Sequence, residues 1–161
     1  MENLDAVDLA LLDQLQQDSS LTNQELAARV HISPPTCLRR VKRLRDTGVI
    51  ARQVAILDPE KLAGAIGHGL QAVVEITLER QGHDEQEAFE SRLIADAAVQ
   101  QCYRVSPGPD FVLIVHARDM PDYLKLAQRL FTSDANVRNV KAFFSVKRAK
   151  FEPRIALSKP A

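Results

Sequence analysis

A break of only three residues, His31-Ile32-Ser33, constrains the fold of this chain more than any other feature of its sequence. Before the break, Thr22 and Glu25 form a T-x-x-E capping box, which predicts the start of a short helix. After it, Ser33 is a favourable N-cap and Pro34 suits the first helical position. Two short helices joined this tightly predict a helix-turn-helix.

An earlier helix is expected to complete this N-terminal unit. Apolar residues recur at helical spacing between Leu4 and Leu15, which predicts a helix over residues 5–17. Asp5 and Asp8 lie in its first turn, where the helix dipole favours negative charge.

The third helix, which begins at Pro34, is predicted to have an inner and an outer face. The inner face is expected to carry Leu38, Val41 and Leu44. Four side chains at positions i, i+3, i+4 and i+7 are expected to share the outer face: Thr36, Arg39, Arg40 and Arg43. An arginine bonds two acceptors of a guanine edge in the major groove, and a threonine methyl meets a thymine methyl. We therefore expect this face to read DNA bases, and Arg40→Ala to relax base preference.

Neighbouring groups on the same helix suit phosphates better than bases. Lys42 and Arg45 lie beside the outer stripe. The first amides of the helix, around Ser33 and Pro34, are also expected to take a phosphate.

The charges of the N-terminal third are segregated along the chain, although the net charge of the whole protein is zero. Residues 1–28 contain six acids and no Lys or Arg, whereas residues 29–52 contain seven Lys or Arg and one acid. This local excess of positive charge indicates a surface for phosphates. A solvated helix face is the alternative explanation for such a run.

The second half of the sequence predicts the order strand, helix, strand, strand, helix, strand. The strands are expected at 70–78, 99–105, 111–117 and 137–146, with helices capped by Asp84 and Glu87 and opened by Pro121. This order is the ferredoxin-like βαββαβ arrangement, an antiparallel sheet with both helices on one face. The other face carries apolar residues and would be an exposed patch in a monomer, so we expect at least a dimer.

These patterns predict an α+β protein of two domains. Residues 1–50 are expected to form a helix-turn-helix (winged-helix-like) DNA-binding domain, and residues 67–148 a ferredoxin-like domain that senses a ligand and oligomerises. Residues 51–66 are expected to be a connecting strand and linker, because the β-prone run 49–57 meets Asp58-Pro59. Residues 149–161 are expected to be a C-terminal tail.

The chain resembles the Lrp/AsnC (feast/famine) family of transcriptional regulators over nearly its whole length. The resemblance is carried by residues 21–27, by residues 32–44 with their S-P-x-x-C-L-x-R-V-x-x-L pattern, by Gly48-Val49-Ile50, and by the strand 74–78. It implies a sequence-specific DNA-binding regulator of amino-acid metabolism genes. It also implies dimers that pair through their sheets, often assemble into octamers, and bind an amino acid or related metabolite between dimers.

The effector site implied by the resemblance matches this chain only in part. The family's turn between the second and third sheet strands usually reads Gly-Asp-aromatic-Asp, whereas here it reads Pro107-Gly108-Pro109-Asp110. The two prolines lack the backbone N–H groups that hold a carboxylate. The residues expected to bind the effector are Ser106, Gly108 and Asp110, with Met120, Phe143 and Phe144 from the family's response region.

Other function classes are less well supported by the sequence. The four histidines have no metal-ligand spacing, and no G-x-S-x-G, P-loop or G-x-G-x-x-G is present, so we expect neither an enzyme, nor a metal site, nor a cofactor beyond the effector. The strand 111–117 lacks the basic-aromatic pattern of RNA-recognition modules. An architectural, effector-independent DNA-binding protein remains the alternative.

The cellular setting is predicted from what the sequence does not contain. Cys37 and Cys102 form no C-x-x-C pair, which favours reduced thiols. No apolar run is long enough to span a bilayer, and the N-terminus has no basic signal region, so we expect a cytoplasmic protein without membrane contact.

Overall fold

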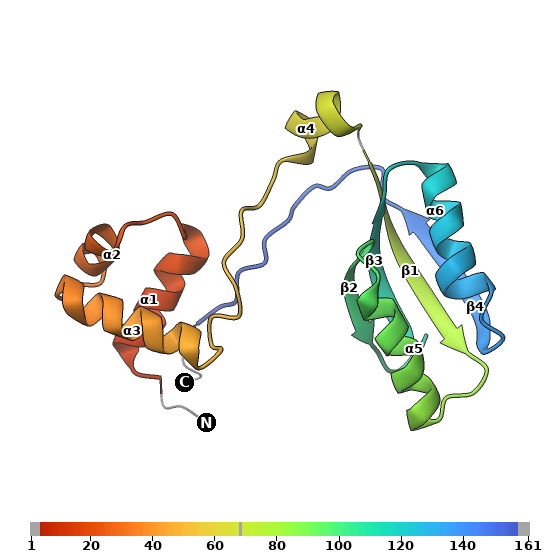
Figure 1. The fold of residues 1–161 in the computed structure, drawn as a ribbon, viewed down its shortest axis with the longest axis horizontal. Helices are drawn as coiled ribbons and strands as arrows, with labels where there is room; N and C mark the ends of the chain where they lie inside the picture. The colour runs from red at the N-terminus through yellow and green to blue at the C-terminus, as the bar shows by residue number, and fades with distance from the viewer. Residues whose placement is uncertain (1–3, 68, 158–161) are drawn as a thin grey trace. The chain divides into compact units, whose positions relative to one another are not determined.

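The computed structural model describes residues 4–67 and 69–157, which form two compact units (Figure 1). The first unit contains the described residues up to Ile56 together with those from Lys150 onward. The second unit spans Leu57–Ala149. The chain therefore passes between the units twice, once before Leu57 and once after Ala149.

The first unit contains the three predicted helices, α1 (Ala6–Gln17), α2 (Asn23–Arg29) and α3 (Pro34–Asp46). Their starts confirm the capping signals of the sequence. Thr22 and Glu25 cap α2 reciprocally, and the Ser33 hydroxyl accepts the Thr36 N–H at the start of α3. The helices share a small core built on Leu11, Leu26, Ala27, Cys37 and Val41.

The turn between α2 and α3 depends on one residue with a positive φ. His31 has φ 56°, a left-handed conformation that non-glycine residues seldom adopt. The turn brings Asn23 to the start of α3, where its side-chain amide donates to the Pro34 carbonyl at 2.9 Å. The predicted helix-turn-helix is present.

Residues 49–57 are extended but form no strand, so the predicted connecting strand is wrong for this structure. A strand needs a neighbouring ladder to satisfy its backbone groups, and no described segment pairs with these residues. They instead form one side of a groove of the first unit, whose other sides are the C-terminal half of α1 and residues 153–157.

The C-terminal residues pack on α1 within this first unit. The Gln16 side chain donates to the Ile155 carbonyl at 3.1 Å and accepts the Ile155 N–H at 2.7 Å. Arg154 pairs with Asp13 at 2.7 Å. The segment predicted as a tail thus makes specific contacts through its described part, residues 149–157.

The predicted linker contains a helix, α4 (Pro59–Ile66). Asp58 caps it, because its carboxylate accepts the N–H groups of Glu60 at 3.0 Å and Lys61 at 3.4 Å. Pro59 lies in the first turn, where proline is favourable. Asp58-Pro59, expected to begin a connector, is also a helix-start signal.

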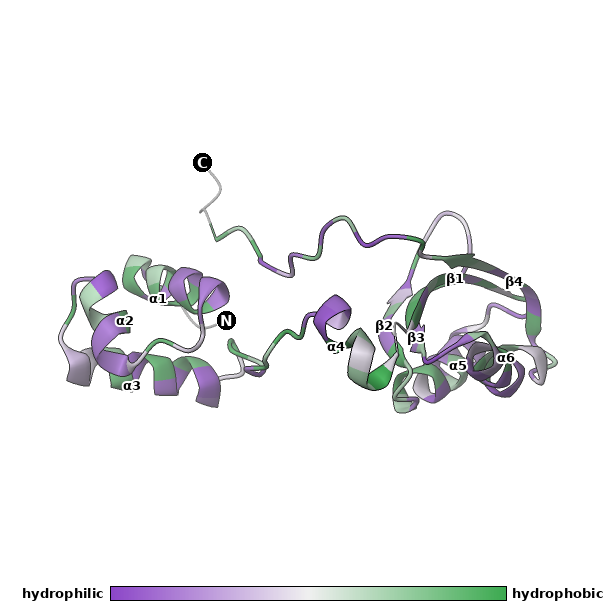
Figure 2. Ribbon diagram, turned by 90° about the horizontal axis from the view of Figure 1, so that it is seen from above, coloured by the Kyte–Doolittle hydropathy of each residue, from purple (hydrophilic) through white to green (hydrophobic). Residues whose placement is uncertain are grey.

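The second unit contains a four-stranded antiparallel sheet in the order β2-β3-β1-β4. The bounds of the strands are β1 (Leu70–Leu78), β2 (Val99–Arg104), β3 (Phe111–Ala117) and β4 (Val137–Phe144). The helices are α5 (His83–Ala95) and α6 (Met120–Ala127), the latter continued by a π-helical turn, η1 (Gln128–Thr132). Figure 2 shows α5 and α6 on the same side of the sheet, which confirms the ferredoxin-like fold.

Alternating residues of the central strands build the core under these helices. Every second residue of β1 from Ala72 and of β3 from Phe111 is buried. Phe89 and Leu93 of α5, with Leu126 of α6, pack against them. The predicted cap of α5 is wrong, because the residue before the helix is Gly82 and no side chain caps it.

Among the residues that the structure describes, no helix is both long and apolar enough to span a membrane.

Candidate functional site

The inner face of α3 is set by Cys37, Val41 and Leu44, which are all buried. Val41 and Leu44 lie on the inner face as predicted, but Cys37 rather than Leu38 begins the apolar stripe. Each residue turns the helix by about 100°, so burial of Cys37 in place of Leu38 rotates the inner face and changes which side chains face outward. Arg39 and Lys42 are exposed on the side opposite the core.

Leu38 does not lie on the inner face, where the sequence predicts it. Its side chain is 62% exposed, beside Arg39 on the helix surface. An exposed apolar side chain on a recognition helix suits the methyl group of thymine. Sequence reasoning missed this residue, because a leucine at helical spacing is typical of a core position.

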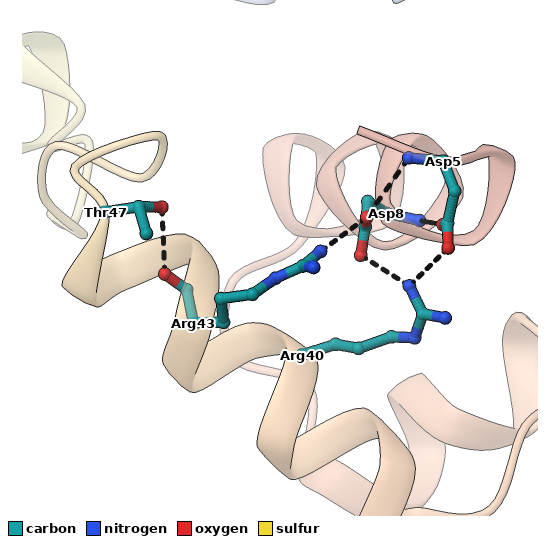
Figure 3. A network of polar contacts seen from close by, with 5 residues as sticks. All are labelled: Asp5, Asp8, Arg40, Arg43 and Thr47. Carbon is teal, nitrogen blue, oxygen red and sulfur yellow. Dashed lines mark hydrogen bonds and ion pairs between the residues drawn. The ribbon is translucent and has the colours of Figure 1, made fainter. Parts of the chain in front are cut away.

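Arg40 and Arg43 do not extend outward as predicted but turn toward α1 (Figure 3). Nη1 of Arg40 lies 2.7 Å from Oδ2 of Asp5 and 2.8 Å from Oδ1 of Asp8. Nη2 of Arg43 lies 2.5 Å from Oδ2 of Asp8. The predicted common face of four residues is therefore wrong for these two arginines, which pair with carboxylates of α1.

The electrostatics of this cluster follow from its hydrogen bonds. Asp8 is completely buried, whereas the side chain of Arg40 is 23% exposed. The backbone N–H of Asp8 and the guanidinium of Arg40 lower the pKa of Asp5. Asp5 and then Asp8 raise the pKa of Arg40, so Arg40 and Asp5 both remain charged at neutral pH.

The remaining predicted DNA-contacting residues lie on the exposed side and at the start of α3. Thr36 is half-buried and its hydroxyl lies 2.8 Å from that of Ser33. Arg45 donates to the Gln53 side chain at 2.6 Å, so it is bound to the extended segment. Arg39 and Lys42 form no hydrogen bond or ion pair with the described residues, which leaves their charges available to a partner.

The second predicted site begins at the turn between β2 and β3. Ser106, Pro107 and Gly108 are exposed, and Gly108 has φ 125°, a conformation open to glycine. The backbone N–H groups of Ser106 and Gly108 have no acceptor within the described chain. This turn offers two donors at the surface. The sequence predicts a third, the N–H of Asp110, but that group donates to the Ile76 carbonyl.

Asp110 is directed away from this surface. Its carboxylate accepts the Leu78 N–H at 2.7 Å and the Gln81 side-chain amide at 3.2 Å. Asp110 as a whole is only 9% exposed. Its own N–H donates to the Ile76 carbonyl at 2.8 Å. Asp110 thus fastens the turn to the end of β1 and has little capacity left for a ligand's ammonium group.

The other predicted effector residues lie at the far end of the sheet. Phe144 packs edge-to-face on Tyr123 of α6, with ring centroids 4.9 Å apart. Met120 precedes Tyr123 by three residues and therefore shares its side of the helix, with 42% of its surface exposed. Phe143 points to the opposite face of the sheet, because successive strand residues alternate.

Within one chain the two predicted effector groups are separated by the length of β3. The turn 106–110 precedes Phe111, whereas Met120 follows Ala117, and Phe144 pairs with Ala72 near that same end. Seven strand residues span about 20 Å. One chain therefore does not bring the six predicted residues into a single pocket.

Two family models match this chain and correspond to its two parts. Residues 4–51 match the winged helix-turn-helix DNA-binding model, and residues 71–155 match the Lrp/AsnC ligand binding domain. The protein belongs to the Lrp/AsnC family. The matched ranges include α1 to α3 and the whole ferredoxin-like sheet, so this Lrp/AsnC protein is a DNA-binding transcriptional regulator with a ligand-binding domain.

Relatives of this Lrp/AsnC protein support the same assignment. An HTH-type transcriptional regulator of Haemophilus influenzae is 34% identical over 157 residues, which cover 98% of this chain and 91% of the relative. A leucine-responsive regulatory protein of Rhizobium meliloti is 35% identical over 147 residues, covering 91% of this chain and 92% of its own.

A solved structure agrees over nearly the whole chain. A transcriptional regulator of Neisseria meningitidis in complex with L-methionine has a TM-score of 0.83 and 30% identity. The alignment covers 96% of the present chain and 97% of that one.

Proposed function

We propose that this Lrp/AsnC protein controls amino-acid metabolism genes by binding operator DNA through α3, and that an amino acid or related metabolite modulates this binding. The observation that carries the proposal is the pair of unpaired cations, Arg39 and Lys42, on the exposed side of a helix whose start is fixed by Ser33 and Pro34. The regulator acts by binding rather than by catalysis, and we place it in the cytoplasm with the DNA.

The proposed DNA contacts follow from the positions of these side chains on α3. Arg39 reads a base edge, with Thr36 and Leu38 beside it for thymine methyl groups. Lys42 and Arg45 approach phosphates. The two residues after Ser33 are prolines without an N–H, and the Thr36 N–H donates to Ser33, so these backbone groups add no phosphate contact. In a dimer, two copies of α3 enter successive major grooves about one turn of DNA apart.

The proposed effector is an amino acid, because the related Neisseria regulator was solved in complex with L-methionine. We propose that the exposed amides of Ser106 and Gly108 hold its carboxylate. Met120, Phe143 and Phe144 supply the apolar part of the response region, with Asp110 holding the turn in place. Because these groups lie at opposite ends of one sheet, their joint action requires more than one copy of the chain.

The regulation we propose is a shift between assemblies. The dimer, and the octamer that it builds, bring turns and sheet ends of different copies together. An amino acid that binds one assembly more tightly than another shifts the population toward it and changes DNA affinity.

The test combines DNA selection with mass measurement. A pool of random duplexes is selected with the full-length protein, and light scattering is recorded with and without each of the twenty amino acids. Recovery of a palindrome, together with a change in mass or affinity caused by one amino acid, is the expected result. Failure to recover any preferred sequence would contradict the DNA-reading proposal.

A second candidate, an effector-independent architectural protein, is favoured by one observation. The Asp110 carboxylate is already bound to Leu78 and Gln81, and two prolines remove donors from the adjoining turn. DNA binding with weak sequence preference and no response to any amino acid would support this candidate over the regulator that we propose.

A further inference from the structure

Asp8 is the centre of the polar network between α1 and α3 (Figure 3). Its Oδ1 accepts Arg40, while its Oδ2 accepts Arg43 and, at 3.2 Å, the backbone N–H of Asp5. Asp5 adds a second carboxylate to Arg40 at 2.7 Å. The recognition helix therefore has five basic residues in its sequence, but two of them are neutralised by acids of another helix.

Burial and charge make this arrangement specific to arginine. A completely buried carboxylate is costly unless cations and hydrogen bonds compensate it, and Asp8 receives both. A guanidinium binds carboxylate and phosphate oxygens with the same geometry. The acids of α1 therefore occupy the same donors that Arg40 and Arg43 would present to the DNA backbone.

We propose that Asp8, supported by Asp5, is a specificity-determining residue that withholds Arg40 and Arg43 from DNA phosphates. This inference rests on the proposed function of α3. Phosphate contacts supply most of the sequence-independent affinity of a DNA-binding protein, so each withheld arginine lowers binding to random DNA. Base contacts by Arg39 and its neighbours then account for a larger share of the total, which raises the ratio of specific to non-specific binding.

A purely structural role for Asp8 predicts a different outcome from this one. If the network only held α1 against α3, its loss would weaken binding to every DNA. If it withholds two arginines, its loss increases binding to random DNA. The salt dependence also separates the two roles, because the logarithmic slope steepens by about 0.9 for each additional phosphate neutralised.

The experiment measures the affinity of the full-length protein for its selected operator and for a random duplex of equal length, at several salt concentrations. Asp8→Asn is compared with wild type and with Asp18→Asn, a charge-matched control at the C-cap of the same helix. Asp18 accepts hydrogen bonds from Ser20 and pairs with no arginine in the described structure, so its replacement changes the net charge equally. Circular dichroism confirms that each variant is folded.

We expect Asp8→Asn to bind random DNA at least about fivefold more tightly than Asp18→Asn does, with a salt slope steeper by about 0.9 to 1.8 per bound subunit. The ratio of operator to random affinity falls. Adding Arg40→Gln and Arg43→Gln to Asp8→Asn returns the slope to the wild-type value. Equal affinities and slopes for Asp8→Asn and Asp18→Asn would overturn the proposal.

A second variant keeps the proposal testable if Asp8→Asn does not fold. Arg43 is 42% exposed, so Arg43→Gln is expected to fold and to leave the salt slope on random DNA unchanged. A slope flatter by about 0.9 would show that Arg43 contacts phosphate and would refute withholding. Because both readouts use random DNA, they remain decisive even if no operator is recovered, in which case only the proposed sequence reading fails.

Discussion

Arg154 and Asp13 are 141 residues apart in the sequence, yet Nη2 of Arg154 lies 2.7 Å from Oδ1 of Asp13 on α1. Next to this pair, Ile155 exchanges two hydrogen bonds with the side chain of Gln16. The described C-terminal residues thus belong to the first unit, although β4, from which they continue, belongs to the second. The second unit is therefore preceded and followed in the chain by segments of the first unit.

Removal of residues 150–161 is expected to destabilise the first unit selectively. Arg154→Ala alone should lower its free energy of unfolding by about 0.2–1 kcal/mol, because the pair is partly exposed and screened by solvent. The truncation should cost more, since it also removes the contacts of Ile155. Calorimetric unfolding and hydrogen exchange of the α1 amides measure both effects, with Lys147→Ala as control. Unchanged exchange in α1 after truncation would contradict this prediction.

Asp110→Ala is expected to destabilise the ferredoxin-like unit by about 1–3 kcal/mol, because the buried Leu78 N–H loses its acceptor. Asp110→Asn should cost less, since an amide oxygen can still accept that hydrogen. Thermal unfolding compares the two variants. If a ligand's ammonium group depends on the Asp110 carboxylate, then titration calorimetry will show Asp110→Asn binding the amino acid far more weakly while remaining folded. We expect no such loss.

His31→Gly is expected to stabilise the first unit by up to about 1 kcal/mol. The backbone of His31 is held at φ 56°, where a Cβ costs about 1–2 kcal/mol. The greater flexibility of glycine in the unfolded chain offsets part of this gain. His31→Val should destabilise, because a β-branched residue is poorer in this conformation. Chemical denaturation of the three proteins checks the order, which would be reversed if the histidine ring made a stabilising contact.

The first unit is expected to lose stability in acid. Thr22 holds the pKa of Glu25 below its usual value through hydrogen bonds from its hydroxyl and backbone N–H, and Asp8 and Arg40 do the same for Asp5. A depressed folded pKa contributes stability above the unfolded pKa that disappears as the pH falls through the folded one. Melting curves from about pH 7 to about pH 3 should show this decline. Thr22→Ala should make the decline shallower, whereas an unchanged profile would exclude the contribution of Glu25.

Two leucines of α3 offer a direct test of which side of the helix faces the core. Leu44 is completely buried and Leu38 is 62% exposed. Leu44→Ala should cost about 2–5 kcal/mol of unfolding free energy, because it leaves a cavity. Leu38→Ala should change stability by no more than about 0.5 kcal/mol. Similar losses for both variants, measured by urea denaturation, would place Leu38 in the core.

Much of the fold was predictable because its signals are local. A capping box, an N-cap followed by proline, and alternating apolar residues each act within a few positions of one another. They predicted the helices α1 to α3 and the order of the ferredoxin-like elements. The linker helix α4 was also predictable, because Asp58-Pro59 is such a local signal, although the same pair is typical of a connector.

The incorrect predictions have a different cause, because each depended on packing that local sequence signals do not specify. The stripe of Thr36, Arg39, Arg40 and Arg43 was defined by spacing alone, which states which residues share a face but not where that face points. The burial of Cys37 fixed the direction, and a cysteine is a weaker hydrophobic signal than the leucine beside it. The run 49–57 was similarly β-prone, but no described segment pairs with it.

The sequence by itself determined where the helices α1 to α3 begin, which strand residues alternate, and the order of the ferredoxin-like elements. Only the tertiary structure decided that Arg40 and Arg43 bind Asp8, that Asp110 fastens a turn, and that Arg154 reaches Asp13. The physical reason is the distance along the chain over which each kind of interaction acts. Backbone capping and periodicity act between neighbours in the chain, whereas the partner of a charged side chain is chosen by packing that brings distant residues within hydrogen-bonding distance.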